Sequence, residues 1–423
     1  MRTTLNILVF GSGAREHAIA ESISKSPLLN KLYLAEAGAF DLGEVIEFSD
    51  YEDLAKKCAV LKIDMAVFGP EGPLCDGIVD IFKAHNLPCI GVDKHFSQLE
   101  SSKLFGKKFM EKHGIKTAKY EVIADIEEAS AAILSKAGNK GKFPSVVIKA
   151  DGLCGGKGVV IANNEAFAQR TINEFLEGKF GDNSKTILLE EFLQGEELSL
   201  MSLWDGKTLL SFAPSRDFKK LNKSSSAPNT GGMGAFCPAK LNEFQRKKLD
   251  EYKNKLKKSL ELEKADFVGF IYSGLIMAQK DGAWDWHVLE YNVRLGDPEA
   301  QATLAHLKTD FLEVLQAALA QNLDKIKLDY NEDISACLTL ACEGYPKTPR
   351  DRKKITLPEE TAENRDIKVF YAGVEEIDGE MYSKGGRVLS LCTTSQDPFW
   401  DLKNFAKEIE MENKYFRTDL EVR

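Results

Sequence analysis

Short apolar runs alternate with amphipathic segments over the first hundred residues of the chain. The apolar runs are 5–10, 31–36, 65–70 and 88–92. Continuous apolar runs of this length are typical of strands that are buried on both faces. The segments 14–26 and 77–86 have the pattern of helices, and this alternation of strand and helix predicts a doubly wound parallel sheet. We place this first domain at residues 1–102.

Longer elements are predicted in the middle of the chain. Residues 101–114 have the pattern of a helix with a serine N-cap and a stop at Gly114, and residues 243–263 form a charged amphipathic helix. Residues 224–236, "SSSAPNTGGMGAF", are polar and rich in glycine, which predicts a loop. The lysines of the second helix are expected on a solvated face.

Strands are predicted on both sides of the second helix. Residues 185–206 have the pattern of two strands with a turn at Gly195. The apolar stretches 267–278 and 284–294 flank the Asp-Gly pair at 281–282, which is a strong hairpin signal. We therefore expect an antiparallel hairpin here.

The last hundred residues return to short strands. These strands are 335–344, 368–373 and 386–392. We assign residues 328–423 to a third domain, which leaves 103–327 as the second. Three domains agree with a length of 423 residues at roughly 150 residues per domain.

Composition and charge exclude several classes of protein. Hydrophobic residues make up 43% and charged residues 29%, as in soluble globular proteins. The net charge of −9 argues against nucleic acid as a partner but allows a local cationic pocket. No apolar stretch approaches the roughly 18 residues that a membrane span needs, and the N-terminus lacks the apolar region of a signal peptide. The eight cysteines include no CxxC pair, which argues against a zinc or redox motif and favours a cytoplasmic protein.

The segment 9–17, "VFGSGAREH", is the first candidate site. A strand, Gly11, Gly13 and then a helix suit an anion at the helix N-terminus, and Glu36 could bond a ribose, as in dehydrogenases. Glu16 stands where the third glycine of GxGxxG would be, and it would crowd a pyrophosphate. A tight strand–helix turn without a ligand is the alternative.

The segment 149–158, "KADGLCGGKG", is the second candidate site. Its glycines let the backbone approach a ligand, and their N–H groups can point at phosphate oxygens. It is not a Walker A loop, because Gly158 follows Lys157 where Ser or Thr would stand. A mobile lid over a nucleoside triphosphate fits better. A hairpin turn with solvated lysines is the alternative, but it does not explain Lys149 beside an apolar run.

The third candidate is the segment 287–299, "HVLEYNVRLGDPE". If it is a strand, Glu290, Asn292 and Arg294 share one face. Leu289, Tyr291 and Val293 then share the other. A carboxylate beside an amide oxygen suits Mg²⁺, and Arg294 could hold a phosphoryl group. A surface strand with Glu–Arg pairing is the alternative. The second and third candidates together predict ATP with magnesium at its phosphates.

Seven motifs follow one another in a family-specific order. They are "GPEGPL" (69–74), "SSKLF" (101–105), "KADGLCGGKGV" (149–159), "EEFLQGEE" (190–197), "PNTGGMGAF" (228–236), "EYNVRLGDPE" (290–299) and "GGRVL" (385–389). On these motifs nearly the whole chain resembles the glycinamide ribonucleotide synthetases of the ATP-grasp superfamily. The resemblance implies an α/β ATP-grasp fold with an N-terminal doubly wound parallel-sheet domain, a mobile ATP lid at about 120–194 and a smaller C-terminal mixed α/β domain.

The resemblance also implies the reaction. ATP, glycine and 5-phosphoribosylamine would give glycinamide ribonucleotide, ADP and phosphate through glycyl phosphate, in purine biosynthesis. No covalent enzyme intermediate is required, and a monomer or weak homodimer is expected. Another ATP-grasp carboxylate–amine ligase and a non-catalytic nucleotide-binding regulator are the alternatives.

Roles for individual residues follow from the same resemblance. The residues implied to bind ATP are Lys103, Lys149, Gly155, Gly156, Lys157, Glu190, Phe192 and Glu197. Those implied to face 5-phosphoribosylamine are Gly11, Gly13, Glu16, Glu71 and Arg387. Glu290 and Asn292 would hold Mg²⁺ or Mn²⁺. Arg294, Asp217 and Lys149 would be catalytic: Arg294 at the transferred phosphoryl group, Asp217 beside glycine or the incoming amine, and Lys149 at the ATP phosphates.

The sequence departs from the family pattern at two places near the implied site. The loop after the second strand is "AEAGAFDLG" (35–43) instead of a "PGN"-like loop. "SRDFKK" replaces the usual "SQDHKR", which adds a charge at Arg216 and removes an imidazole at Phe218. Both changes concern the substrate pocket.

Overall fold

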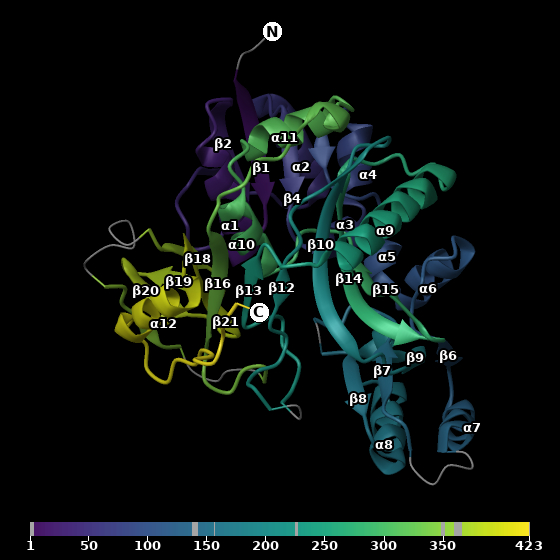
Figure 1. Ribbon diagram of the computed structural model, residues 1–423. Coiled ribbons are helices and arrows are strands. Elements are labelled where there is room, and N and C mark those ends of the chain that lie inside the picture. Colours follow the sequence, from purple (N-terminus) through teal and green to yellow (C-terminus); the bar gives the residue numbers. More distant parts are fainter. Residues whose placement is uncertain are drawn as a thin grey trace.

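The computed structural model describes residues 4–137, 143–155, 157–224, 227–347, 352–358 and 366–422. Figure 1 shows the N-terminal sheet at the top, the C-terminal sheets at the left and a small lid that projects at the lower right. A long hairpin connects these parts through the centre. Within the described ranges no helix is both long and apolar enough to cross a membrane.

The N-terminal domain is a five-stranded sheet in the order β3-β2-β1-β4-β5, and all its strand pairs are parallel. Its strands are β1 Leu5–Phe10, β2 Leu29–Ala35, β3 Glu44–Val45, β4 Met65–Phe68 and β5 Cys89–Ile90. Its helices are α1 Ala14–Ser24, α2 Tyr51–Leu61, α3 Glu71–Asp76 and α4 Ile78–Ala84. The predicted parallel sheet is confirmed. The sequence analysis missed β3, which is too short to show a pattern, and α2, whose N-cap is Asp50.

The centre of the molecule is an antiparallel sheet in the order β11-β10-β14-β15. Its strands are β10 Gly195–Trp204, β11 Leu209–Ser211, β14 Gly269–Lys280 and β15 Ala283–Asn292. Asp281 and Gly282 have left-handed φ angles of 51° and 81°, and Lys280 pairs with Ala283 across the turn, so the predicted hairpin is confirmed. The helices α5 Gln98–Ser101, α6 Lys103–Lys112 and α9 Glu243–Leu262 lie against β15.

The predicted turn at Gly195 is wrong. Gly195 is the first residue of β10 and pairs with Ala278 on β14. A Cβ atom at this position would lie 2.0 Å from the Met277 carbonyl oxygen, so the glycine is required by the close approach of two strands. The chain changes direction in residues 192–194 instead, where it leaves the lid sheet for the central sheet.

The lid has a sheet and a core of its own. Its strands run in the order β6-β9-β7-β8, namely β6 Tyr120–Ile123, β7 Val146–Ala150, β8 Val159–Ala162 and β9 Ile187–Glu191. The helices α7 Ile126–Ala137 and α8 Glu165–Leu176 pack on this sheet, and η1 Gly181–Ser184 precedes β9. The lid core includes Ile133, Ile148 and Phe175 and is separate from the core of the hairpin.

The C-terminal part contains two sheets. The larger runs β12-β13-β16-β21-β18 and the smaller runs β17-β20-β19. Their strands are β12 Arg216–Asp217, β13 Gly234–Cys237, β16 Ile334–Ala341, β17 Lys354–Ile355, β18 Lys368–Tyr371, β19 Val374–Ile377, β20 Glu380–Ser383 and β21 Arg387–Ser395. The helices nearby are α10 Glu299–His306, α11 Phe311–Leu319, η2 Leu323–Lys325 and α12 Pro398–Glu408. The larger sheet thus recruits two strands from the middle of the sequence, and the end of the predicted loop 224–236 is β13.

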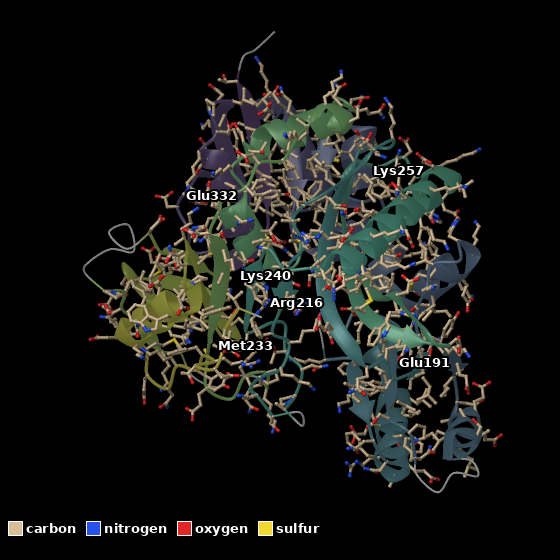
Figure 2. The ribbon with its side chains drawn as sticks, in the orientation of Figure 1. Glu191, Arg216, Met233, Lys240, Lys257 and Glu332 are labelled. Carbon is tan, nitrogen blue, oxygen red and sulfur yellow. The ribbon has the colours of Figure 1, made fainter. Side chains whose placement is uncertain are left out.

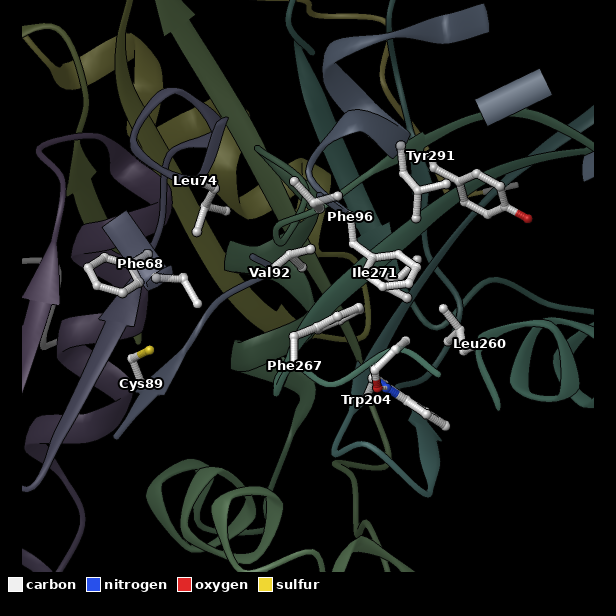
Figure 3. Packing of buried hydrophobic residues seen from close by; sticks show 14 of the residues in the cluster. Phe68, Leu74, Cys89, Val92, Phe96, Trp204, Leu260, Phe267, Ile271 and Tyr291 are labelled. Carbon is white, nitrogen blue, oxygen red and sulfur yellow. Dashed lines mark hydrogen bonds between the residues drawn. The ribbon is translucent and has the colours of Figure 1, made fainter. Parts of the chain in front are cut away.

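One apolar core joins the N-terminal sheet to the hairpin. Figure 3 shows Phe68 and Leu74 of the N-terminal domain on one side, Phe267 and Ile271 of the hairpin segment on the other, and Val92 between them; all five belong to one cluster. All five side chains are buried. Burial of this kind contributes roughly 1.5–3 kcal/mol for each large apolar side chain. The joint between these two parts is therefore fixed, and it sets the carboxyl end of β4 beside β15.

Candidate active site

A cavity of about 350 Å³ lies where all these parts meet. Arg15 of α1, Gly155 of the lid, Glu290 of β15 and Arg387 of β21 all line it. The predicted site residues on its wall are Glu71, Lys103, Gly155, Glu190, Asp217, Glu290, Asn292, Arg294 and Arg387. Residues that are distant in sequence therefore converge on one space.

Other predicted site residues lie off this wall. They are Gly11, Gly13, Glu16, Lys149, Lys157, Phe192 and Glu197. Lys157, Phe192 and Glu197 are exposed to solvent, and Lys149 is buried directly behind the wall. Gly156 lies outside the described residues.

Charged side chains form a buried cluster where the lid meets β15. Glu190 Oε2 lies 3.0 Å from Lys107 Nζ and 3.2 Å from Lys149 Nζ. Lys149 also donates to the Leu289 carbonyl oxygen at 2.9 Å, which ties the lid strand β7 to the hairpin. The neighbouring Glu191, labelled in Figure 2, lies at the outer side of this joint and pairs with Lys280 of β14. Within the part of the chain that is described, Glu190 Oε1 has no hydrogen-bond partner.

The predicted alternation along β15 is interrupted by a bulge. Gly274 pairs with Glu290 but Leu275 pairs with Val288, so Leu289 has no partner on β14. Leu289 was predicted on the face opposite Glu290, and the bulge instead brings it to the cavity wall beside Glu290. Glu290, Asn292 and Arg294 all line the cavity, and so does Tyr291, which was predicted on the other face.

Glu290 is held as a carboxylate. Burial alone would raise its pKa, but the surrounding cations Lys219, Lys149, Lys103 and Arg294 together lower the pKa below its usual value. In the described ranges no group of three or more His, Cys, Asp or Glu side chains could hold a metal by itself. The oxygens of Glu290 and Asn292 therefore suit only a cation that takes its remaining ligands from a substrate or water.

Arg294 lies between two acids. Its guanidinium is 3.0 Å from Glu100 Oε1 and 3.4 Å from Glu71 Oε2, and it donates to the Leu295 carbonyl oxygen at 3.2 Å. Burial raises the pKa of Glu100. At Glu71 burial acts in the same direction, but Arg294 and Arg15 together lower the pKa below its usual value. The acids fix the arginine in place as a cation at the cavity wall.

A titratable pair, Asp217 and Lys219, also lines the cavity. Asp217 is 3.4 Å from Lys219, and burial raises the pKa of Asp217 to about 7 although Lys219 opposes the shift. Nearby, Glu299 accepts hydrogen bonds from Tyr272 at 2.9 Å and Ser199 at 3.0 Å. Asp217 can therefore gain or lose a proton near neutral pH.

The glycine-rich turn after β1 holds a carboxylate instead of a dinucleotide. Glu16 Oε2 accepts from the Gly13 backbone N–H at 3.0 Å, and Glu16 Oε1 lies 2.5 Å from Arg15 Nε. A Cβ atom at Gly69 would lie 2.1 Å from Glu16 Oε1. The side chain of Glu16 thus fills the space that a pyrophosphate would need, and the dehydrogenase alternative is wrong. Arg15 reaches the cavity instead and donates to the Leu295 carbonyl oxygen at 3.1 Å.

Arg387 ties the C-terminal sheet to the glycine-rich loop. It donates to the Gly231 and Asp297 carbonyl oxygens, each at 2.7 Å, and to Asp297 Oδ2 at 2.6 Å. Burial alone would lower the pKa of Arg387, but Asp297 together with Tyr345, Glu299 and Cys337 raises it above its usual value. Arg387 therefore stays charged, with its cavity position fixed by the backbone.

The two departures from the family pattern have different consequences. Phe218 packs its ring 5.7 Å from Phe399 in the C-terminal core and does not line the cavity. Arg216 pairs with Glu196 at 2.8 Å. In the loop 35–43, Phe40 stacks on His17 at 4.4 Å, so this loop closes over α1.

The sequence analysis missed several residues on the cavity wall. They are Arg15, Glu100, Lys107, Lys219, Tyr272, Asp297 and Glu299. Asp297 and Glu299 belong to the quoted motif 290–299, and Lys107 follows Lys103 by one helical turn, so these could have been proposed. Glu100 and Tyr272 had no local signal, because only the packing of α5 and β14 brings them to the wall.

Sequence comparison covers most of the chain. The sequence model of the phosphoribosylglycinamide synthetase N domain matches residues 5–100, that of its ATP-grasp (A) domain matches 101–300, and that of its C domain matches 335–423. A phosphoribosylamine–glycine ligase of Fusobacterium nucleatum is 37% identical over 430 residues, covering 98% of each chain. One from Pasteurella multocida is 35% identical over 430 residues, covering 98% of this chain and 97% of its own.

Comparison with solved structures indicates the same family as the sequence comparison. The crystal structure of phosphoribosylamine–glycine ligase from Thermotoga maritima matches with a TM-score of 0.80 and 30% identity, covering 98% of this chain and 100% of that one. The predicted α/β ATP-grasp architecture is confirmed, and the ligase is favoured over the non-catalytic and other-ligase alternatives. The chain belongs to the phosphoribosylglycinamide synthetase family, the ATP-dependent ligases of purine biosynthesis that join glycine to phosphoribosylamine.

Proposed function

We propose that the cavity holds ATP, glycine and 5-phosphoribosylamine together and ligates the last two through glycyl phosphate. The observation that carries the proposal is that side chains from all three matched segments line one space. Such an arrangement supplies positioning and charge stabilisation, which are the main contributions of a protein to phosphoryl transfer.

ATP would lie between the lid and β15. Lys103 and Lys149 would contact its phosphates, with Gly155, Gly156 and Lys157 closing over them. Glu190 Oε1 is an acceptor without a partner among the described residues, and the adenine amino group would supply the missing donor. Phe192 and Glu197 are exposed to solvent. We propose that the backbone at Phe192 receives the base and that the carboxylate of Glu197 receives the ribose.

A divalent cation, Mg²⁺ or Mn²⁺, would be held by Glu290 and Asn292. Two protein oxygens are typical for Mg²⁺ that is bound mainly through substrate phosphates and water. The cation would neutralise charge on the phosphates of ATP. The low pKa of Glu290 keeps this ligand ionised at neutral pH.

The chemistry would proceed in two displacements. A carboxylate oxygen of glycine attacks the γ-phosphorus of ATP, the bond to ADP breaks, and glycyl phosphate forms beside Arg294. The amine of 5-phosphoribosylamine then attacks the acyl carbon, phosphate leaves, and the nitrogen loses a proton. Asp217, with a pKa of about 7, would take that proton or orient the amine.

The phosphoribosyl group would lie toward α1 and β21, near Glu71 and Arg387. Gly11, Gly13 and Glu16 lie behind the wall, so we propose that they act through Arg15, whose guanidinium they support. Arg15 is 7% exposed and faces the cavity as a cation suited to an anionic group.

We also propose the divisions at 102/103 and 327/328, with a lid at about 120–194. The separate lid core supports its movement as a unit. Strands β12 and β13 precede the boundary at 327/328 in the sequence, but they belong to the C-terminal sheet. The boundary therefore divides the sequence and does not divide this sheet. A cytoplasmic location is proposed because the eight cysteines, all within the described ranges, carry free thiols. A monomer or weak homodimer is proposed from the family resemblance alone.

The experiment is ADP release with ATP and Mg²⁺ in a two-by-two design. Glycine is present or absent, and 5-phosphoribosylamine generated in situ is present or absent. Release only with both substrates is the expected result. Release that needs another acid or amine would mean a different ligase. ATP binding without release under any condition would mean a regulator and would refute the proposal.

A further inference from the structure

Three charged side chains are buried together where the lid meets β15. Lys107 and Glu190 are each 1% exposed and Lys149 is 4% exposed. Both ammonium groups contact the same oxygen, Glu190 Oε2, at 3.0 and 3.2 Å. A single buried carboxylate needs only one cation for neutrality, so the second lysine requires an explanation.

The two lysines differ in the donors that remain available. An ammonium group has three N–H donors. Lys107 uses them on Thr117 Oγ1 at 2.8 Å, on the Ala118 carbonyl oxygen at 3.3 Å and on Glu190. Lys149 uses two, on the Leu289 carbonyl oxygen and on Glu190, within the described part of the chain. Lys149 thus keeps one N–H donor for a ligand, whereas all three N–H donors of Lys107 are used by protein atoms.

The anchor of Lys107 belongs to the rigid part of the molecule. Thr117 donates to the Val288 carbonyl oxygen of β15 at 2.6 Å, and Lys107 itself lies on α6, which packs on β15. The position of its ammonium group therefore does not depend on how the lid is placed. Lys107 can hold the same carboxylate oxygen when Lys149 is drawn toward a phosphate.

The other oxygen of Glu190 is left as an acceptor. An uncompensated buried acceptor is unfavourable, and a ligand donor would relieve it. Adenine offers an amino group at its 6-position. Guanine has a carbonyl oxygen there, which would place two acceptors against each other. A carboxyl oxygen that is fixed in place as an acceptor would therefore discriminate between the two bases.

We propose that Lys107 is the positioning residue for base selection: it holds the Glu190 carboxyl group in place, with Oε2 occupied and Oε1 directed at the 6-amino group of the purine, so that ATP is taken in preference to GTP. This inference rests on the proposed ATP site. It assigns Lys107 no contact with the nucleotide. The pKa of Lys107, lowered by burial to about 8, agrees with a cation that is retained at neutral pH.

The test compares Lys107→Met with Lys108→Met, a matched control at the exposed neighbouring position of α6. The dissociation constants of ATP and GTP are measured by calorimetry, and kcat and KM are measured for ADP or GDP release with both substrates. Lys107→Met is expected to weaken ATP binding on the order of 10-fold or more, as loss of a charged hydrogen bond can. Because this contact is the same in ground and transition states, KM should rise while kcat changes by less than about threefold. The preference for ATP over GTP should fall by a similar factor of about 10, and Lys108→Met should match wild type.

A second variant covers the case in which Lys107→Met does not fold. Thr117→Val removes one hydrogen-bond acceptor of the Lys107 ammonium group and keeps the charge of Lys107. It is expected to lower the preference for ATP over GTP by a smaller factor than Lys107→Met. An ATP/GTP ratio within twofold of wild type in the folded variants would overturn the inference. Failure of the proposed function is distinct, because wild type would then bind ATP in the calorimeter without glycine-dependent turnover.

Discussion

Replacing Gly69 by alanine should displace Glu16 from its buried position. A Cβ atom at Gly69 would lie 2.1 Å from Glu16 Oε1 and 2.4 Å from Glu16 Cγ, far inside van der Waals contact. Gly69 does not have a left-handed φ, so the backbone itself accepts alanine. The whole cost of the substitution therefore comes from the collision with Glu16.

The size of the destabilisation follows from the contacts that Glu16 loses. Moving its carboxylate breaks the contacts to the Gly13 N–H at 3.0 Å and to Arg15 at 2.5 Å. Overpacking costs about 1–3 kcal/mol and a hydrogen bond to a charged group contributes about 1.5–3 kcal/mol, so we expect Gly69→Ala to destabilise α1 by roughly 2–4 kcal/mol. Once Glu16 is already alanine, Gly69→Ala should be close to neutral, within about 1 kcal/mol.

The assay is hydrogen exchange of the α1 amides in wild type, the two single variants and the double variant. It reports local opening, which suits a chain with several domains better than a single unfolding midpoint. Gly72→Ala is the matched control, because in the described structure its Cβ would meet nothing within 4 Å. Equal effects of Gly69→Ala with and without Glu16 would refute the reasoning, since the predicted coupling is about 2 kcal/mol or more.

Three further predictions concern the site and its support. Lys149→Met should lower kcat for ADP release on the order of 10²-fold, as loss of a preorganised charged donor does, and a fall of less than threefold would contradict its role. Glu290→Ala should raise the Mg²⁺ concentration needed for half-maximal activity by roughly 10- to 100-fold, and an unchanged Mg²⁺ titration would remove it from the metal site. Burial lowers the pKa of His17 from 6.5 to about 4, and its Nδ1 accepts from the Tyr371 N–H at 3.0 Å, so the unfolded state binds the proton more readily. The free energy of unfolding should therefore decrease by up to about 3 kcal/mol as pH falls from 6.5 toward 4. Urea titrations should show that His17→Gln loses most of this pH dependence.

The elements that the sequence predicted well are those with a local physical cause. Apolar runs such as 5–10 are continuous because both faces of a central parallel strand are covered. Asp281 and Gly282 adopt the left-handed conformations that a two-residue hairpin turn requires. Ser102 accepts from the Phe105 N–H and begins α6 as a side-chain cap does.

The elements that were missed depend on contacts between distant segments. Gly195 was interpreted as a turn residue, but its reason is the Met277 carbonyl across the strand pair. Strand β12 pairs with β13, and β13 finds its other partner in β16, about a hundred residues later, so no local sequence pattern predicts this sheet. The bulge at Leu289 and the pairing of Lys107 with Glu190 likewise arise only when β15 and the lid come together.

The measurement that tests the account most directly follows the oxygen atoms of glycine. Glycine labelled with ¹⁸O in its carboxylate is turned over with ATP and 5-phosphoribosylamine, and the released phosphate is analysed by mass spectrometry. Attack of the carboxylate on ATP and displacement by the amine predict one labelled oxygen in each phosphate, with ADP as the other product. Product formation with unlabelled phosphate, or label in AMP, would contradict the proposed chemistry of this cavity.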